Sequence, residues 1–493
     1  MALLSVGDLT FAYPGSGDPV FEHISFQIDT DWKLGFLGRN GRGKTTFLRL
    51  LQGRYEYGGT IAGAPETAYF PYEVPDMTKL TMEVLSDACP RAEEWELLRE
   101  TGLLGIDPEA LYRPFGTLSN GERTKALLAA LFCGEDRYLL IDEPTNHLDT
   151  AGRQAVAAYL RRKDGFLLVS HDRDFLDGCV DHILVLNRTG AEVQSGNFST
   201  WWENRERRDA FEQARNDRLK NEIRRLEQSA QERRQKADAV ERAKTGISSQ
   251  GIVKHGLRPY LGEKSRKGQQ QRKNIDRRAE RAIAEKSGLL KDLERTDSLK
   301  LRPLTARGRL LDARELSLFY GEKQACGPLT FTLEPGDRLA LEGANGSGKS
   351  TLLKFLQGAN IAHTGTARLA SGLVLSYVPQ DTSHLRGSLT DYARESGVDR
   401  TLLLAILRKL NFPREQFEKD MADWSAGQKK KALIARSLCQ SAHLYLWDEP
   451  LNYIDVWSRM QIEELLLTCR PTMVLVEHDG AFRRKIATKS VRL

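Results

Sequence analysis

Two copies of one glycine-rich motif stand 305 residues apart in the chain. Residues 38–45 read Gly-Arg-Asn-Gly-Arg-Gly-Lys-Thr, and residues 343–350 read Gly-Ala-Asn-Gly-Ser-Gly-Lys-Ser. Both match the phosphate-binding loop G-x-x-x-x-G-K-[ST]. In that loop backbone N–H groups surround phosphate oxygens, the lysine neutralises charge and the hydroxyl holds Mg²⁺. Each copy follows an apolar segment and opens a predicted helix, whose N-terminus favours anions. We therefore expect two sites for a nucleoside triphosphate.

A second repeated motif places two acids at the end of an apolar strand. Asp142 and Asp448 are expected to orient Mg²⁺, and the glutamates that follow them, Glu143 and Glu449, to polarise an attacking water. His171 and His478 each follow another apolar strand, from which a histidine can reach a terminal phosphate. A lone Ser-His-Asp tripeptide such as residues 170–172 makes no catalytic triad, because adjacent side chains point opposite ways. The position of the histidines relative to the other motifs favours a functional role for them.

The repeat extends over almost the whole chain. Five motifs recur at an offset of 306 or 307 residues, namely Tyr13 with Tyr320, Ser119 with Ser425, Asp142 with Asp448, Glu143 with Glu449, and His171 with His478. This constancy indicates a duplicated domain with almost no internal insertions. We expect the first α/β domain to cover residues 1–200 and the second residues 309–493.

Residues 201–308 have a different character. Apolar residues at heptad-like spacing predict two helices, and the segment 245–262, with four glycines and a proline, breaks the pattern between them. We interpret the region as a long antiparallel α-helical hairpin with its tip at 245–262, in which ~40 residues of helix extend ~60 Å. The alternative is a charged, solvated linker.

Charge is distributed unevenly along the chain. Residues 203–308 contain 29 Lys and Arg against 17 Asp and Glu, whereas the remainder contains 44 against 50. A basic middle between two mildly acidic domains points to a polyanionic partner. No stretch of ~20 apolar residues predicts a membrane helix, and the N-terminus shows no leader pattern. Six scattered cysteines are typical of reduced thiols, so we expect a cytoplasmic location.

Two helix caps, Ser119–Glu122 and Ser425–Gln428, complete the motif set. The order of phosphate loop, cap, paired acids and histidine resembles the ATP-binding cassette family over both domains. The resemblance implies ATP and Mg²⁺ as cofactors and two P-loop ATP-binding cassette domains of α/β fold. It also implies that the cap of each domain closes over the nucleotide held by the other. Thus residues 38–45, Asp142, Glu143 and His171 would combine with residues 425–428. Residues 343–350, Gln380, Asp448, Glu449 and His478 would combine with residues 119–122.

The same resemblance assigns roles to individual residues. Tyr13 and Tyr320 would stack on adenine, although either could be a half-buried aromatic residue of a strand. The remaining ATP-binding residues would be Gly38, Asn40, Gly41, Gly43, Lys44, Thr45, Thr46, Ser119, Gly121, Glu122, Gly343, Asn345, Gly346, Gly348, Lys349, Ser350, Thr351, Ser425, Gly427 and Gln428. The metal ligands would be Thr45, Asp142, Ser350, Gln380 and Asp448.

Departures from the family pattern predict two active but unequal sites. The first copy has Tyr72 where the second has the expected Gln380, and Asn120 and Ala426 replace a glycine of the usual cap.

Two such domains joined by a basic hairpin resemble the ABC-F subfamily of ribosome-acting proteins. Only 47 residues separate Tyr72 from Ser119, and 45 separate Gln380 from Ser425. A transporter-coupling subdomain tends to be longer. The long linker and the segment Trp447–Asp455 resemble the antibiotic-resistance branch. The sequence around Gly38 and Asp448 resembles its lincosamide, streptogramin A and pleuromutilin group.

This resemblance implies ribosome protection by a monomer without a transmembrane partner. ATP would clamp the domains in the tRNA exit site, and the hairpin would contact large-subunit rRNA and shift the P-site tRNA so that the drug leaves. Alternatives are a housekeeping translation factor and the ATPase subunit of a membrane transporter. The residues expected to contact RNA are Lys244, Lys254, Arg258, Tyr260, Lys264, Arg266 and Lys267, unless the tip is merely disordered.

Overall fold

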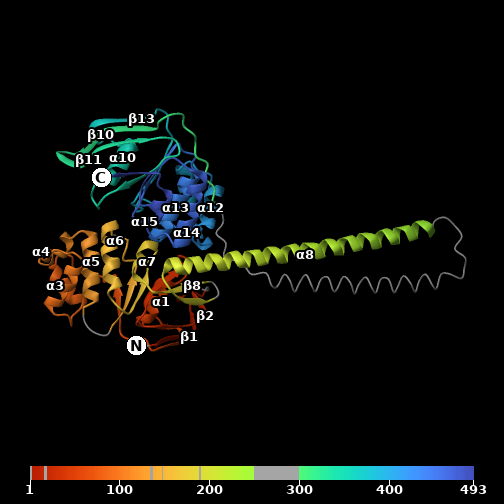
Figure 1. Ribbon diagram of the computed structural model, residues 1–493, viewed down its shortest axis with the longest axis horizontal. Helices are drawn as coiled ribbons and strands as arrows, with labels where there is room; N and C mark the ends of the chain where they lie inside the picture. Colours follow the sequence, from red (N-terminus) through yellow and green to blue (C-terminus); the bar gives the residue numbers. More distant parts are fainter. Residues whose placement is uncertain (1–2, 16–18, 134–136, 147, 188–189, 249–298) are drawn as a thin grey trace. The chain divides into compact units, whose positions relative to one another are not determined.

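The computed structural model describes residues 3–15, 19–133, 137–146, 148–187, 190–248 and 299–493. The chain divides into two compact units, one of Met1–Trp201 with Thr296–Leu493 and one of Trp202–Arg295. The first unit contains two α/β domains of the same plan (Figure 1), so the expected pair of cassette-like domains is confirmed.

The first domain has a mixed six-stranded sheet and a small antiparallel sheet. Its strands are β1 (Leu3–Phe11), β2 (Phe21–Asp29), β3 (Lys33–Gly38), β4 (Gly58–Ala62), β5 (Thr67–Phe70), β6 (Tyr138–Asp142), β7 (Phe166–Val169), β8 (His182–Leu186) and β9 (Ala191–Ser195). Its helices are α1 (Lys44–Leu51), α2 (Thr81–Ala88), α3 (Glu94–Leu103), α4 (Pro108–Leu111), η1 (Phe115–Thr117), α5 (Asn120–Leu131), α6 (Thr150–Arg161) and α7 (Arg173–Cys179). The large sheet has the order β5-β6-β7-β3-β8-β9, in which only β9 is antiparallel to its neighbour.

The second domain repeats this order without the last strand. Its strands are β10 (Leu311–Tyr320), β11 (Lys323–Leu333), β12 (Arg338–Glu342), β13 (Ala362–Leu369), β14 (Leu375–Val378), β15 (Leu444–Asp448), β16 (Met473–Val476) and β17 (Lys489–Arg492). Its helices are α10 (Lys349–Leu356), α11 (Leu389–Glu395), α12 (Arg400–Lys409), η2 (Arg414–Glu418), η3 (Met421–Asp423), α13 (Ala426–Cys439), α14 (Val456–Cys469) and α15 (Gly480–Ile486). The parallel sheet β14-β15-β16-β12-β17 matches the first five strands of the other domain.

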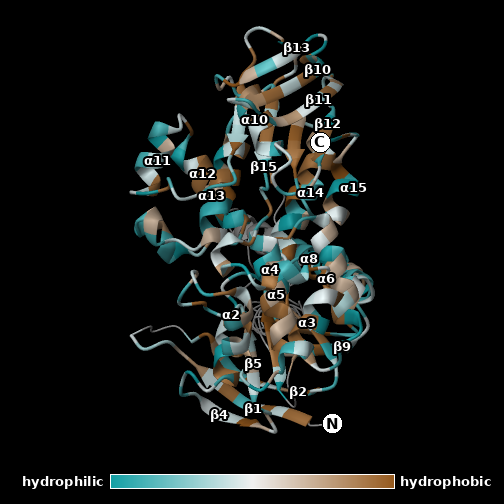
Figure 2. Ribbon diagram, turned by 90° about the vertical axis from the view of Figure 1, so that its left-hand side faces the viewer, coloured by the Kyte–Doolittle hydropathy of each residue, from teal (hydrophilic) through white to brown (hydrophobic). Residues whose placement is uncertain are grey.

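Burial accounts for the continuous apolar sequence of the central strands. All four residues of β7 and of β16 are buried, and each strand is a continuous apolar run, as expected of parallel strands covered on both faces. Figure 2 shows hydrophobic segments inside both domains. Because the carboxyl ends of parallel strands meet at one edge, β3 and β6 bring the phosphate loop and the paired acids together.

A left-handed glycine starts each phosphate-loop helix. Gly43 precedes α1 with φ 84°, and Gly348 precedes α10 with φ 89°. A Cβ on Gly43 would lie 2.5 Å from Val20 Cγ1, and one on Gly348 would lie 2.4 Å from the Ala325 carbonyl oxygen. Both positions therefore need glycine for backbone conformation and for space.

The linker is described only in its first half. Helix α8 (Phe198–Ser248) has 51 residues and agrees with the first predicted helix of the hairpin. The second predicted helix and most of the predicted tip, which together fall in 249–298, lie outside the described residues. No helix in the described part of the chain is long and apolar enough to cross a membrane. After the linker, Leu299 and Leu301 are buried in the hydrophobic core of the second domain.

The two α/β domains contact each other through a buried ion pair. Arg173 at the start of α7 donates two hydrogen bonds to Glu463 on α14, one of them 3.2 Å long between Nη1 and Oε2. The Arg173 and Glu463 side chains are 6% and 4% exposed. Arg173 also lies 3.7 Å from Asp479, and Arg484 pairs with Asp174 at 2.7 Å. A second contact joins the first turn of α8 to α14. There the rings of Trp201 and Trp457 pack edge to face, with their centroids 6.1 Å apart.

Replacing Arg173 by Ala is expected to destabilise the chain by about 3 kcal/mol, because the buried Glu463 carboxylate would lose its bidentate partner. Thermal unfolding of the full chain measures this as a fall of several degrees in Tm. Arg394→Ala is the matched control, since its ion pair with Asp391 is exposed and should contribute less than about 1 kcal/mol. Equal shifts for the two variants would contradict a stabilising role for the buried pair.

Candidate nucleotide-binding sites

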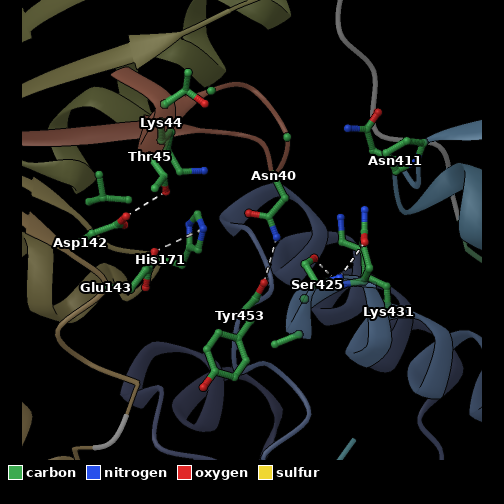
Figure 3. Close-up of a pocket in the computed structure, with 18 of the residues that line it drawn as sticks. Asn40, Lys44, Thr45, Asp142, Glu143, His171, Asn411, Ser425, Lys431 and Tyr453 are labelled. Carbon is green, nitrogen blue, oxygen red and sulfur yellow. Dashed lines mark hydrogen bonds and ion pairs between the residues drawn. The ribbon is translucent and has the colours of Figure 1, made fainter. Parts of the chain in front are cut away.

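One cavity of 520 Å³ is lined by residues of both α/β domains, and we call it site one. The first domain contributes Asn40 to Thr46 of its phosphate loop and α1, apart from Arg42, together with Asp142, Glu143 and His171. The second domain contributes the cap Ser425–Gln428. Figure 3 shows Lys44, Thr45 and Asp142 on one side of this cavity and Ser425 on the other. The structure thus brings together most of the residues that sequence analysis combined for the first site, whereas Gly38, Arg39 and Arg42 do not line the cavity.

The phosphate-loop lysines are held by carbonyl groups of their own loops. Lys44 Nζ donates to the Gly38 oxygen at 2.7 Å, and Lys349 Nζ donates to the Gly343 and Ala344 oxygens at 2.9 and 2.8 Å. Burial lowers the pKa of both lysines from the ordinary value, although nearby carboxylates oppose the shift. The ammonium groups are therefore positioned inside the loops, where phosphate would bind.

The predicted Mg²⁺ ligands lie next to each other in both domains. Thr45 Oγ1 donates to Asp142 Oδ2 at 2.8 Å, and in the second domain burial raises the pKa of Asp448 while the nearby Ser350 hydroxyl opposes that shift. Asp448 Oδ1 is buried and makes no hydrogen bond with the part of the chain that the structure describes. A hydroxyl beside a carboxylate is the oxygen donor pair that Mg²⁺ uses together with phosphate oxygens, so these residues fit the ion.

The two candidate catalytic glutamates share an unusual backbone conformation. Glu143 has φ 50° and Glu449 has φ 46°, in the left-handed region that non-glycine residues rarely adopt. Each is held by its own N–H, which donates to the Val169 oxygen at 2.9 Å and the Val476 oxygen at 3.0 Å, respectively. Strain of this kind concentrates at functional sites. Each glutamate also lies near its histidine, with Glu143 Oε1 3.4 Å from His171 Nε2 and Glu449 Oε1 3.5 Å from His478 Nε2.

The side chains of these glutamates have different partners. Burial and the neighbouring Asp142 raise the pKa of Glu143 to about 8, and its Oε1 makes no hydrogen bond with any described residue. Burial acts on Glu449 too, but the neighbouring side chains of His478, Gln380 and Asn452 outweigh it and lower its pKa below the ordinary value. The Asn452 bond is 2.6 Å long. Glu449 is therefore the better oriented and more readily ionised of the two.

The cap of the second domain approaches the first domain closely. Ser425 accepts a hydrogen bond from the Gln428 N–H at 3.3 Å and starts α13 with a capping box. A Cβ on Gly427 would lie 2.6 Å from the Tyr453 oxygen and 3.2 Å from Asn40 Nδ2. That same Asn40 nitrogen donates to the Tyr453 oxygen at 2.8 Å. A hydrogen bond thus joins the phosphate loop of the first domain to the loop that follows the paired acids of the second domain.

A second cavity, of 430 Å³, surrounds the other phosphate loop, and we call it site two. It is lined by Gln380, Glu449, His478 and most of the phosphate loop, and the first domain adds Asn146 and Leu148. The predicted residues Gly343 and Asp448 do not line it. The first-domain cap contributes only Asn120, whereas Ser119, Gly121 and Glu122 do not line this cavity. The Ser119 hydroxyl instead donates to Glu122 Oε2 at 2.7 Å within its own capping box. Site two is therefore less completely enclosed by the opposite cap than site one.

Two further pairs of residues named by sequence analysis differ between the sites. Tyr13 lines site one, and its hydroxyl lies 2.7 Å from Thr46 Oγ1, while Tyr320 lines site two and is 55% exposed. Stacking on adenine remains a prediction for both. Gln380 lines site two as expected, but Tyr72 lies outside site one and lines an adjacent cavity.

Sequence analysis missed several lining residues. Site one also includes Asn411–Pro413, Lys431 and Tyr453, and site two includes Lys323 and Gln324. Only Tyr453 carried a signal, because it departs from the histidine at the corresponding place in the first copy. Of the residues predicted to contact RNA, Lys244 belongs to α8, whereas Lys254, Arg258, Tyr260, Lys264, Arg266 and Lys267 lie outside the described residues.

The sequence is similar to those of several known ATP-binding and ribosome-related proteins. The chain is 28% identical to the ATP-binding protein Uup of Caulobacter vibrioides over 96% of this chain and 75% of that protein. It is 26% identical to the ribosome protection protein VmlR of Bacillus subtilis, over 96% and 84%. It is 25% identical to the energy-dependent translational throttle protein EttA of Haemophilus influenzae, over 95% and 88%.

Solved structures share the fold at lower identity. The archaeal ribosome recycling factor aABCE1, solved with the stalk protein aP1, superposes with a TM-score of 0.61 at 17% identity, over 98% of this chain and 87% of that one. The ribosome-bound archaeal Pelota and ABCE1 model gives 0.63 at 19% identity, over 98% and 76%. The family described as ABC transporter matches residues 21–146 and 326–452, more than half of the 493 residues. Through both of its α/β domains, the chain belongs to the ABC transporter family.

Proposed function

We propose that the chain is an ATPase that hydrolyses ATP to ADP and phosphate at sites one and two. The observation that carries this proposal is site one itself. There the phosphate loop and Glu143 of one domain face the cap Ser425–Gln428 of the other within a single cavity. Closing both surfaces around a triphosphate would exclude water other than the attacking one.

Different residues of each site would bind the phosphates, hold Mg²⁺ and accept the proton of the attacking water. Backbone N–H groups of the phosphate loop and Lys44 or Lys349 would hold the phosphates, and Thr45 with Asp142, or Ser350 with Asp448, would hold Mg²⁺. When bound, Mg²⁺ would neutralise charge on the phosphate oxygens. Glu143 or Glu449 would accept a proton from water, and the adjacent histidine would orient that glutamate and reach the terminal phosphate.

We propose the ribosome as the partner. Support comes from similarity, over 96% and 95% of this chain, to proteins named for ribosome protection and for translational throttling, and from the basic composition of residues 203–308. Residues 242–273 contain nine basic side chains and one acidic side chain, which suits contact with RNA phosphates. In this proposal the protein acts in the cytoplasm as a monomer without a transmembrane partner.

The more specific proposal is protection of the ribosome from drugs that bind the peptidyl-transferase centre. The linker tip would approach the P-site tRNA and large-subunit rRNA and promote drug release, and hydrolysis would then release the protein. Similarity to VmlR supports this role, whereas similarity to EttA at nearly equal identity supports the alternative of a housekeeping translation factor.

The double variant Glu143→Gln with Glu449→Gln is expected to bind ATP but to turn it over ~10²–10⁴-fold more slowly, because each site loses its base. With ATP it should therefore accumulate on ribosomes in co-sedimentation. Lys44→Ala with Lys349→Ala is the control and should not accumulate, since both phosphate loops lose their cation. Turnover of the glutamate variant near that of the wild type would remove both glutamates from catalysis.

The single variants are expected to differ, with Glu449→Gln reducing steady-state turnover more than Glu143→Gln. The reason is that Asn452 donates a hydrogen bond to Glu449, with Gln380 nearby, while Glu143 makes no matching bond with a described residue. Adding Asn452→Ala to Glu143→Gln should lower the remaining turnover further. The idea of unequal sites is wrong if both single variants lose the same activity.

Deleting residues 250–260 is expected to abolish drug protection while leaving ribosome binding and ATPase activity in place. The deletion removes Lys254 and Arg258 but keeps the other seven basic residues of 242–273 and both ATP sites. Growth of a susceptible host on lincosamide- or pleuromutilin-class drugs, with co-sedimentation in parallel, measures both effects. A variant with residues 250–260 in scrambled order controls for length and charge.

Three results would change this proposal. Full protection by the shortened chain would place the drug-displacing contact outside residues 250–260. Loss of ribosome binding would make the tip an anchor instead. Absence of protection by the intact chain would favour the housekeeping alternative.

A further inference from the structure

Site one has a wall that site two lacks. Asn411, Phe412 and Pro413 of the second domain line site one, opposite the phosphate loop of the first domain. Figure 3 shows Asn411 on the far side of the cavity from Lys44 and Thr45. The corresponding residues of the first domain, 105–107, are all described, and none of them lines site two.

The backbone turn that carries Asn411 does not require a side chain. Asn411 follows α12 with φ 56°, and Gly105 follows α3 with φ 69°. Both turns close in the same way. The Phe412 N–H donates to the Leu407 oxygen at 2.9 Å, and the Ile106 N–H donates to the Thr101 oxygen at 3.1 Å. Glycine adopts this left-handed conformation most easily, so the asparagine adds an amide to a turn that glycine already satisfies.

Two buried side chains fix this turn in place. Lys431 Nζ donates to the Leu410 oxygen at 2.7 Å and to Asp455 Oδ2 at 2.9 Å, and Gln461 Nε2 donates to the Lys409 oxygen at 3.1 Å. A cation at the carbonyl end of a helix is favourable. The position that corresponds to Gln461 in the first copy is Ala155. The second domain therefore holds the end of α12 in a way that the first domain cannot fully repeat.

The Asn411 side chain is available to a ligand. It is partly exposed in the cavity, and it makes no hydrogen bond with the residues that the structure describes. The phosphate loop and the cap Ser425–Gln428 carry the groups suited to phosphates. Tyr13 and Val20 of the first domain and the turn at Asn411 are then left for the nucleoside part. An amide both donates and accepts, which suits ribose hydroxyls or a base edge.

We propose that Asn411 recognises the nucleoside part of the nucleotide in site one from the opposite domain. Site one is then more selective among nucleoside triphosphates than site two. This inference rests on the proposed binding of ATP at site one, and it assigns a specificity-determining role to a residue outside the motifs of the phosphate loop, the cap and the paired acids.

The test is nucleotide binding to the full chain carrying Lys349→Ala, which weakens site two and leaves site one to be measured. ATP, 2′-deoxy-ATP and GTP are titrated with and without the second change Asn411→Gly. That change keeps the left-handed turn and removes the amide. We expect a roughly two- to tenfold weaker affinity for ATP, the effect of losing one hydrogen bond. Discrimination against GTP should fall if the amide faces the base, and discrimination against 2′-deoxy-ATP should fall if it faces the ribose.

Two controls make the result specific. Asn411→Asp keeps the shape but cannot donate when ionised, and it should weaken ATP binding as well. Gly105→Asn places an amide on the equivalent turn, which lines neither site, and should leave ATP affinity at site one unchanged. Unchanged affinity for all three nucleotides in Asn411→Gly, with an unchanged Tm, would overturn the inference. If the Lys349→Ala chain binds no nucleotide, the proposed ATP binding at site one is wrong. The role of Asn411, which rests on that binding, is then wrong as well.

Discussion

Site one depends on the close approach of two domains that are far apart in the sequence. Asn40 in the phosphate loop donates to the Tyr453 oxygen at 2.8 Å, and Gly427 lies so near to both that a Cβ would not fit. The buried pair of Arg173 and Glu463 holds the same two domains together. Because the phosphate loop and the cap belong to different domains, the cavity exists only while these contacts are made. The nucleotide binding that we propose at site one therefore depends on the contact between the two domains.

The duplicated domains have the same plan but different local chemistry. In the second domain Asn452 orients Glu449, and in the first Glu143 has no matching hydrogen bond among the described residues. Enclosure shows the opposite trend, since the whole cap Ser425–Gln428 lines site one and only Asn120 reaches site two. One site thus has the better prepared base and the other the better enclosed cavity.

Much of the fold and of each half-site could be predicted from the sequence. The phosphate loops, the paired acids and the histidines lie where predicted because their chemistry is local. A glycine turn, a helix N-terminus and a carboxylate at a strand end need only a few neighbouring residues and one parallel sheet. The constant offset between the copies also predicted that the second domain would repeat the first, and the strand orders confirm it. The linker could be predicted only as a helical pattern, and its first helix, α8, is the part that the structure describes.

The sequence by itself was enough to predict which residues would bind phosphate and metal, since motif and spacing place those groups within one domain. Only the tertiary structure decided how completely each opposite cap encloses its site. It also showed that Tyr72 lies away from the site that Gln380 enters in the other domain. Asn411 likewise became visible only in three dimensions, because a helix-ending asparagine has no functional pattern in sequence. Contacts between distant segments depend on the shapes and burial of two complete surfaces, and no local spacing encodes them.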